Sequence, residues 1–345
     1  CRSVAAIRRG RDRSGNSDGG HTHRRHAMVA VAPVGCDGNE AAHSLLNVSV
    51  VTRSSPIGVL GATSLVGRPL LDRLARAGHE LLACSRFAAS QPQTAGTTWW
   101  TPRQSLPSDL VIGPWIALCP LWVTVEAFDW LVASGATRLV ALSSTSAVTK
   151  MRSPDAGERR LADRLLTAEH ELEARARMAG IVLVVLRSTM IYDGTSDRNT
   201  TRIAAFIRRF GRFPIAGPAL GLRQPVHADD VAAACVAALA HPAPKGMYTI
   251  SGGEALTFRD LVQRICLSHG LPPRLVPLPR VAWQIASLVS HVCDRGDRVT
   301  VGMAARMNDD LSCDHSDAGR DLGFRPRPFL PGFTQENRAA DRLGR

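Results

Sequence analysis

A short polar turn bounded by Gly61 and Gly67 carries the most specific chemical signal in this sequence. The apolar run 57–60 precedes the turn, and apolar residues recur at helical spacing from Val66 to Leu74 after it. The first glycine allows a tight turn, and the second lets the helix pack closely. The N–H groups at such a helix N-terminus bind a pyrophosphate. The pattern therefore predicts a dinucleotide site, although a strand, turn and helix that bind nothing remain the alternative.

The end of the second predicted strand bears on which dinucleotide is bound. An Asp or Glu at this position accepts hydrogen bonds from the ribose of NAD. Here the sequence has Ser85 and Arg86, a hydroxyl and a guanidinium that suit a 2′-phosphate. NADP(H) is therefore favoured over NAD(H), unless Arg86 is one more solvated arginine. We expect eleven residues to contact the cofactor: Gly61, Thr63, Ser64, Leu65, Val66, Gly67, Ser85, Arg86, Leu118, Ser143 and Ser144.

The elements that must position this turn follow an α/β pattern. Strands and helices alternate from residue 51 onward, which predicts a Rossmann-type doubly wound parallel sheet with a small mixed C-terminal lobe. The expected strands are 57–60, 79–84, 97–101, 115–118, 138–143, 181–186, 223–227 and 247–251, and the later helices are 128–133, 158–178, 229–240 and one capped by Thr257. The segment 271–281 is expected to be a proline-rich connector.

Four segments describe the expected domain organisation. Residues 1–50 form a disordered or non-native N-terminal extension, for which a basic targeting arm is the alternative. Residues 51–190 form the NAD(P)-binding Rossmann domain, 191–332 an interwoven substrate lobe, and 333–345 a mobile tail.

Composition narrows the class of partner. The 345 residues carry a formal net charge of +12 and only 5% aromatic residues, and the charges are spread along the chain. Basic patches with interleaved aromatics are not expected, so no nucleic-acid partner is predicted. The eight cysteines form no close ligand pair, which predicts no metal site and fits a reducing cytoplasm. The apolar segment 281–292 is too short to span a bilayer.

With these motifs in order, residues 55–265 resemble the NAD-dependent epimerase/dehydratase family, the extended and atypical branch of the short-chain dehydrogenases. The resemblance is carried by segments 61–67, 142–148, 186–192 and 225–232, with Ser64 in place of the family's middle glycine. It implies the Rossmann fold and a bound dinucleotide. Segments 197–199 and 224–227 are also similar to the NADPH-binding accessory subunit of respiratory complex I.

The resemblance also shows what is missing. Hydride-transferring relatives carry Tyr-x-x-x-Lys on the helix after the fifth strand, where the lysine lowers the tyrosine pKa. This chain has two tyrosines, and neither is followed by lysine four residues later. With the helix registered on Glu169, the expected positions fall on Leu161 and Leu165. Thr145 matches the family's catalytic Ser or Thr, and Lys150 is a nearby cation that the site could recruit.

The remaining polar candidates belong to the predicted substrate lobe and its surroundings. Tyr192, Arg198 and Arg223 are the expected substrate contacts. Asp229 and Asp230 are interpreted as a helix N-cap and a first-turn acid. Glu169, Glu171 and Glu173 are interpreted as the solvated face of their helix.

Two functions remain open. The first is an oxidoreductase or epimerase, lacking the Tyr-Lys pair, that acts on a nucleotide sugar or small carbonyl compound in the cytoplasm. The second is a non-catalytic NADPH-binding structural or redox-sensing subunit of a larger complex, in which residues 281–292 lie against a membrane or protein partner.

Overall fold

The computed structural model describes residues 55–330, except for 103, 105, 106, 108, 109, 245, 280 and 284–300. All the described elements belong to one compact unit, Thr52–Arg345. The predicted N-terminal extension, the predicted tail and most of the apolar segment 281–292 lie outside the described residues.

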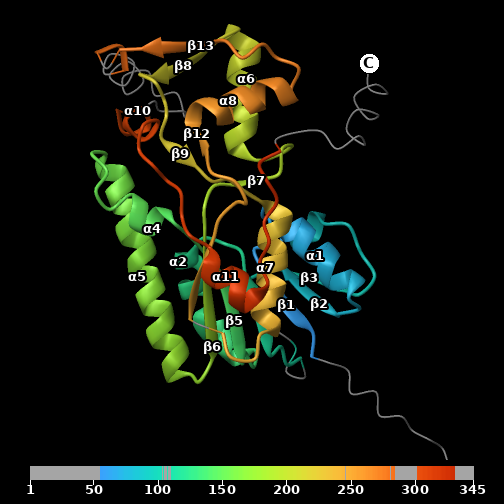
Figure 1. Cartoon of the computed structure of the whole chain (residues 1–345). Coiled ribbons are helices and arrows are strands. Elements are labelled where there is room, and N and C mark those ends of the chain that lie inside the picture. Colours follow the sequence, from blue (N-terminus) through green and yellow to red (C-terminus); the bar gives the residue numbers. More distant parts are fainter. Residues whose placement is uncertain are drawn as a thin grey trace, which may run out of the picture. The chain divides into compact units, whose positions relative to one another are not determined.

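A seven-stranded parallel sheet forms the centre of this unit (Figure 1). The strand order is β11-β6-β5-β4-β1-β2-β3, so the chain starts near the middle and builds outward in both directions. The strands are β1 (Ile57–Leu60), β2 (Leu81–Cys84), β3 (Thr97–Trp100), β4 (Pro114–Ala117), β5 (Arg138–Ser144), β6 (Val182–Ser188) and β11 (Met247–Ile250). The inner strands are apolar because both sheet faces are covered. The predicted doubly wound Rossmann-type fold is confirmed.

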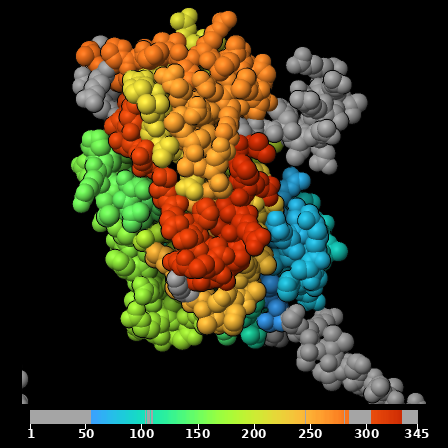
Figure 2. Space-filling view, in the orientation of Figure 1, coloured from blue at the N-terminus to red at the C-terminus, as the bar shows by residue number. Residues whose placement is uncertain are grey.

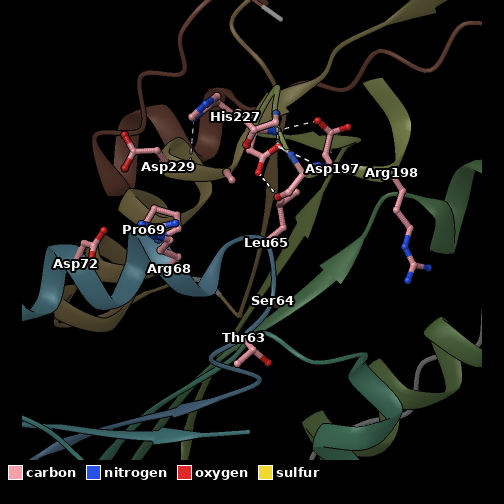
Figure 3. A pocket seen from close by; sticks show the side chains of 14 residues that line it. Thr63, Ser64, Leu65, Arg68, Pro69, Asp72, Asp197, Arg198, His227 and Asp229 are labelled. Carbon is pink, nitrogen blue, oxygen red and sulfur yellow. Dashed lines mark hydrogen bonds between the residues drawn. The ribbon is translucent and has the colours of Figure 1, made fainter. Parts of the chain in front are cut away.

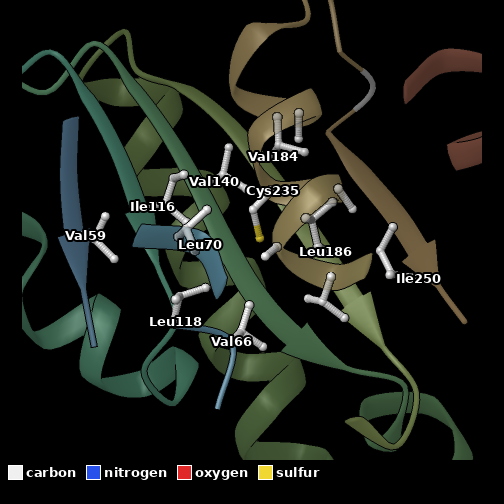
Figure 4. Close-up of a cluster of buried hydrophobic side chains, with 14 of the residues drawn as sticks. Val59, Val66, Leu70, Ile116, Leu118, Val140, Val184, Leu186, Cys235 and Ile250 are labelled. Carbon is white, nitrogen blue, oxygen red and sulfur yellow. The ribbon is translucent and has the colours of Figure 1, made fainter. Parts of the chain in front are cut away.

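Helices cover both faces of the sheet. One face packs against α1 (Gly67–Arg76) and α7 (Ala228–Ala240), where buried side chains such as Leu70, Ile116 and Cys235 form a continuous core (Figure 4). The C-terminal helix α11 (Ser316–Leu322) packs over α7 and β11. The other face packs against α2 (Leu121–Glu126), α3 (Phe128–Ala133) and α5 (Ala156–Met178). This layer arrangement places the turn after β1 at the carboxyl edge of the sheet.

The boundary predicted at residue 190 does not separate the sheet layer from the lobe. Both α7 and β11 come later in the chain, yet β11 pairs in parallel with β6, and α7 packs on α1 and on the central strands. The lobe is therefore interleaved with the sheet layer along the chain.

The lobe itself is small and mixed. It contains α6 (Arg198–Phe210), α8 (Phe258–Ser268) and α10 (Val301–Arg306). Three strand pairs accompany them: β7 (Ile191–Tyr192) with β10 (Val226–His227), β9 (Leu222–Arg223) with β12 (Leu256–Thr257), and β8 (Phe213–Ala216) with β13 (Leu275–Leu278). The expectation of a connector over 271–281 is wrong, because β13 lies within it and pairs with β8 in parallel.

Helix caps agree with the sequence at one position and differ at another. Thr257 Oγ1 accepts from the Asp260 N–H at 3.0 Å, which confirms the predicted cap of α8. Asp229 is not the cap of α7, because His227 Nδ1 accepts from the Asp229 N–H at 3.1 Å. Two acids in the first turn then face the positive end of the helix dipole.

Candidate functional site

The turn between β1 and α1 requires glycine at both of its ends. Gly61 has φ +79°, and a Cβ there would lie 2.7 Å from the Cys119 nitrogen at the end of β4. A Cβ on Gly67 would lie 2.0 Å from the Ala62 carbonyl oxygen. The backbone of the turn therefore folds directly against α1 and against the loop after β4.

The polar groups of this turn fit a pyrophosphate. The N-cap residue of α1, Val66, makes no side-chain cap hydrogen bond, and the first turn holds no acid, so the positive end of the helix is not neutralised by its own residues. Ser64 Oγ is buried and has no hydrogen-bond partner. A buried hydroxyl without a partner is costly unless a ligand or water completes it. The tight backbone turn at residues 61–67, the N-terminus of α1 without a side-chain cap, and the Ser64 hydroxyl together suit the phosphates of a dinucleotide.

The two residues at the end of β2 that were predicted to contact the ribose have different surroundings. Ser85 is buried, its hydroxyl lies 3.0 Å from Thr63 Oγ1, and it accepts from the Phe87 N–H at 3.1 Å. Ser85 therefore holds the two loops together. Arg86 is exposed, and its guanidinium lies 5.8 Å from the Phe87 ring centroid. Of the two, Arg86 is the group that can meet a phosphate.

A cavity of about 840 Å³ opens beside the turn. Figure 3 shows Arg68 and Asp72 of α1 on one side of it. His227 and Asp229, at the start of α7, and the loop that carries Asp197 lie on the other side. The predicted contacts Thr63, Ser64 and Leu65 line this cavity. Val66 and Leu118 are buried in the core that supports the turn.

The serine-rich end of β5 is tied to α5. Ser143 Oγ donates to Glu169 Oε1 at 2.6 Å, and Arg187 on β6 binds the same carboxylate through two nitrogens, Nε at 2.9 Å and Nη2 at 2.5 Å. Glu169 is only 2% exposed, so its interpretation as a solvated residue is wrong. Glu171 and Glu173 are exposed as expected. Ser144 Oγ accepts from the Ser146 N–H at 3.1 Å. The Ser143 hydroxyl thus donates within the protein, whereas the Ser144 hydroxyl accepts one backbone bond and can still donate.

Thr145 begins the short helix α4 (Ser146–Thr149), and its N–H donates to the Ser188 carbonyl at 2.9 Å. Its hydroxyl contacts the Cys313 thiol; burial raises the pKa of that thiol, which the Thr145 contact partly offsets. Lys150 Nζ lies 3.7 Å from Glu158 Oε1. Burial, and then the Arg306 charge, lowers the pKa of Lys150.

The helix face that would carry the Tyr-Lys pair is apolar. Leu161 and Leu165 pack into the core between the sheet and α5, and Leu165 is buried. Neither tyrosine of the chain replaces the pair. Tyr192 and Tyr248 are both at most 2% exposed. Tyr248 OH donates to Asp321 at 3.2 Å, on the core side of the sheet.

The three predicted substrate contacts have different surroundings. Arg198 is exposed and lines the cavity. Tyr192 OH accepts from the Leu330 N–H at 3.2 Å, and burial raises its pKa. Arg223 is buried; it donates to the Leu222 and Asp309 carbonyls at 2.6 and 2.8 Å, and burial lowers its pKa to about 10. Only Arg198 of the three borders the cavity, whereas Arg223 ties the lobe to the segment after α10.

Sequence reasoning missed several residues at this site. His227, Asp229 and Arg68 line the cavity, but none had been assigned to a ligand. Asp229 binds Arg73 at 2.9 Å and Arg327 at 2.7 Å, which join α1, α7 and the C-terminal segment. Burial disfavours the charged carboxylate, but the two arginines outweigh it, and the pKa of Asp229 is lowered. The available sequence signal was the position of His227 between a short strand and the helix that follows it.

Residues 121–251 match the family model described as the NAD dependent epimerase/dehydratase family. This match confirms the resemblance to the NAD-dependent epimerase/dehydratase family. The matched range covers the ends of β5 and β6, α5, and the start of α7. It excludes the glycine turn, so the turn's assignment depends on its own geometry. No curated protein matches the chain.

Several solved structures share the fold of this chain. The protein called gox2253 has a TM-score of 0.61 at 19% identity, over 85% of this chain and 99% of that chain. A UDP-glucose 4-epimerase from Thermotoga maritima, solved with UDP-glucose, has a TM-score of 0.59 at 16% identity, over 84% of this chain and 100% of its own. A short-chain dehydrogenase/reductase superfamily protein from Agrobacterium tumefaciens with bound NAD has a TM-score of 0.57 at 18% identity, over 84% and 99%.

Proposed function

We propose that the chain binds NADP(H) across the carboxyl edge of the sheet, with the pyrophosphate at the turn 61–67. The observation that carries this proposal is the close packing of the turn 61–67 against its neighbours. Side chains at Gly61 and Gly67 would collide with backbone, and the helix behind the turn is uncapped. The protein would then supply binding and orientation, while the cofactor, when bound, supplies or accepts a hydride.

The preference for NADP(H) rests on Arg86. This exposed guanidinium follows β2, where no acid is present to accept from the ribose hydroxyls. A phosphate bound to arginine gains a charge-assisted contact that NADH cannot offer. Arg86→Gln is therefore expected to weaken NADPH binding by roughly tenfold or more, with little effect on NADH. Arg76→Gln, an exposed arginine in the last turn of α1, is the matched control. Equal losses for both cofactors would contradict the assignment.

For the reaction, we propose an oxidoreductase or epimerase-like activity that does not use the family's Tyr-Lys pair. Thr145 is the residue proposed to meet the reacting oxygen, because it stands where the family has its catalytic Ser or Thr. A hydroxyl alone is a weak proton donor, so a bound water or a substrate group would complete the proton transfer. Lys150, with its lowered pKa, is the nearest amine along the chain.

The proposed substrate is a nucleotide sugar or a small carbonyl compound, bound in the cavity beside the turn, with Arg198 facing an anionic group. The support comes from the cavity and from solved structures of the same fold, some of which are described as solved with UDP-glucose or UDP-glucuronic acid. Tyr192 and Arg223 do not line this cavity and are held by protein contacts, so they are not proposed to touch the substrate. Within the described part of the chain, no helix is long and apolar enough to span a membrane. We place the activity in the cytoplasm.

A second candidate is a subunit that binds NADPH without turning it over, in a structural or redox-sensing role. The observation that favours it is the burial of the tyrosines. The chain has only two, and both are buried and bonded to other parts of the protein. Leucines pack where the proton-transfer pair would stand. A site of this kind holds the cofactor but offers no phenol to the substrate.

Turnover separates the two candidates. Purified protein is incubated with NADPH and a panel of carbonyl compounds and nucleotide sugars, and absorbance and products are followed. One substrate consumed at a rate that falls in Thr145→Ala establishes the enzyme. Tight NADPH retention with no consumption across the panel supports the binding subunit.

A further inference from the structure

The outer face of α6 exposes aromatic rings. The inner face of this helix, with Ala204 and Ile207, is buried against α8 and the lobe core. On the other side, Phe206 is 37% exposed and Phe210 is 53% exposed, and their ring centroids lie 4.6 Å apart. Helix α6 ends where the chain turns into β8, at the outer end of the lobe (Figure 1). The rings therefore lie away from the cavity beside the glycine turn.

The same part of the lobe is strongly cationic. Segments 198–216 and 256–278, which hold α6, β8, β12, α8 and β13, contain eight arginines and one aspartate. Arg208, Arg209 and Arg212 are exposed and directly flank Phe210, and the exposed Arg274 accompanies Phe213, whose N–H donates to its carbonyl at 2.9 Å. Basic patches with interleaved aromatic residues were not expected, and this part of the lobe departs from that expectation. In Figure 2, orange atoms of the segment that holds α8 and β13 cover this end of the described unit.

The packing of the rings indicates what they can contact. Phe206 packs against Phe210 and, edge to face at 5.6 Å, against Phe213. The Arg209 guanidinium lies 5.5 Å from the Phe210 ring centroid. Bases of single-stranded nucleic acid need open ring faces on which to stack. Phe206 and Phe210 are instead packed on their neighbours, and the parts that stay exposed are hydrocarbon, which suits the boundary between headgroups and acyl chains of a lipid bilayer.

We propose that the face of α6 carrying Phe206, Arg209 and Phe210, together with Arg212 just after the helix, is a docking surface for anionic phospholipid membranes. The arginines are drawn to anionic headgroups, and the two phenylalanines enter the interface between them. In this binding mode the C-terminal end of α6 contacts the membrane, and the glycine turn with its cavity is not part of the contact. This surface does not depend on the identity of the cofactor or on turnover.

Sedimentation of the full chain with lipid vesicles tests this surface. Vesicles of phosphatidylcholine with 30% phosphatidylglycerol are compared with vesicles of pure phosphatidylcholine, both in about 0.1 M salt. We expect binding to the anionic vesicles that is at least roughly tenfold tighter than to the neutral ones. The double variant Arg209→Glu/Arg212→Glu should lose at least roughly tenfold, as should Phe206→Ser/Phe210→Ser. Phe210→Trp should retain binding, because tryptophan also favours the bilayer interface.

Matched controls come from α5 and the loop before it, far from this face along the chain. Arg152→Glu/Arg160→Glu makes the same charge change at exposed positions, and Met178→Ser removes an apolar side chain that is 89% exposed. Both controls should bind as the wild type does, and circular dichroism should show the same fold for every variant. Equal binding to neutral and anionic vesicles, or α6 variants that bind as the controls do, would overturn the proposal. So would tighter, Phe210-dependent binding to single-stranded RNA than to anionic vesicles.

Discussion

The glycines of the turn are the residues on which the site depends most directly. Gly67 has no room for a methyl group, because its Cβ would lie 2.0 Å from the Ala62 carbonyl oxygen. Gly67→Ala must therefore move α1 away from the turn. We expect a loss of about 1–3 kcal/mol in the free energy of unfolding and a loss of dinucleotide binding, measured by denaturant titration and calorimetry.

Gly246→Ala is the control for that change. A Cβ at Gly246 meets no atom within 4 Å, and the residue has no positive φ. This variant should keep the wild-type stability and the wild-type affinity. If Gly67→Ala behaved in the same way, the close packing of the turn would not be needed for binding.

His227 gives the site a pH dependence. Burial and then the Arg327 charge lower the pKa of His227, while Asp193, Asp229 and Asp230 oppose the shift. The unfolded chain therefore binds a proton to this histidine at a higher pH than the folded chain does. Stability is fully present above the ordinary histidine pKa of 6.5 and is lost as the pH falls below it and through the folded pKa.

The cap of α7 explains the physical cost, because a protonated Nδ1 can no longer accept from the Asp229 N–H. We expect the thermal midpoint of the wild type to decline between pH 7 and pH 5 more steeply than that of His227→Asn. Asparagine keeps a cap acceptor but does not titrate. Parallel curves for the two proteins would show that His227 is not the group responsible.

At the scale of elements, the link between β5, β6 and α5 holds the carboxyl edge of the sheet together. Glu169 is buried and receives two bonds from Arg187 and one from Ser143. Removing its charge leaves the guanidinium, whose side chain is 19% exposed, without its counter-ion. We expect Glu169→Gln to cost about 3 kcal/mol in the free energy of unfolding, measured by denaturant titration.

The comparison variant lies on the same helix. Glu173 is exposed and pairs with Arg177 at 3.1 Å, one turn apart. Glu173→Gln should change the free energy of unfolding by less than about 0.5 kcal/mol. Equal effects at the two positions would mean that the buried pair contributes no more than a surface one.

The sequence predicted most of the sheet but not these links. Buried parallel strands are short apolar runs between helices, so β1, β5 and β6 were recognisable from residue types alone. The burial of Glu169 depends on Arg187, which lies on another strand, and helix periodicity contains no such information. β13 was missed because it contains Pro277, and because its partner strand β8 lies about sixty residues earlier in the chain.

The candidate site was predictable to the same extent. The turn 61–67 and the exposed Arg86 follow from local sequence, and the structure places both at one edge of the sheet. Ser85, Ser143 and Arg223 are held by protein partners, which only the three-dimensional contacts reveal. Residue types in the sequence identify which side chains can bind a ligand. The packing of the fold decides which of those side chains already bind another part of the protein.

At the scale of the whole molecule, two surfaces with different chemistry are joined by one lobe. The cavity beside the turn lies between the sheet layer and the loop before α6, and the cationic, aromatic face lies at the other end of α6. The segment after α10 ties these parts together, through Arg223 at Asp309 and through Arg327 at Asp229 and Asp230. The proposed membrane face and the glycine turn are therefore separate surfaces of the described unit.

The central claim is that the turn 61–67 seats NADP(H), and calorimetric titration of the purified full chain with NADPH and with NADH tests it most directly. We expect one NADPH per chain, bound at least roughly tenfold more tightly than NADH, because Arg86 meets a phosphate that NADH lacks. Failure to bind either dinucleotide, or tighter binding of NADH, would contradict the account.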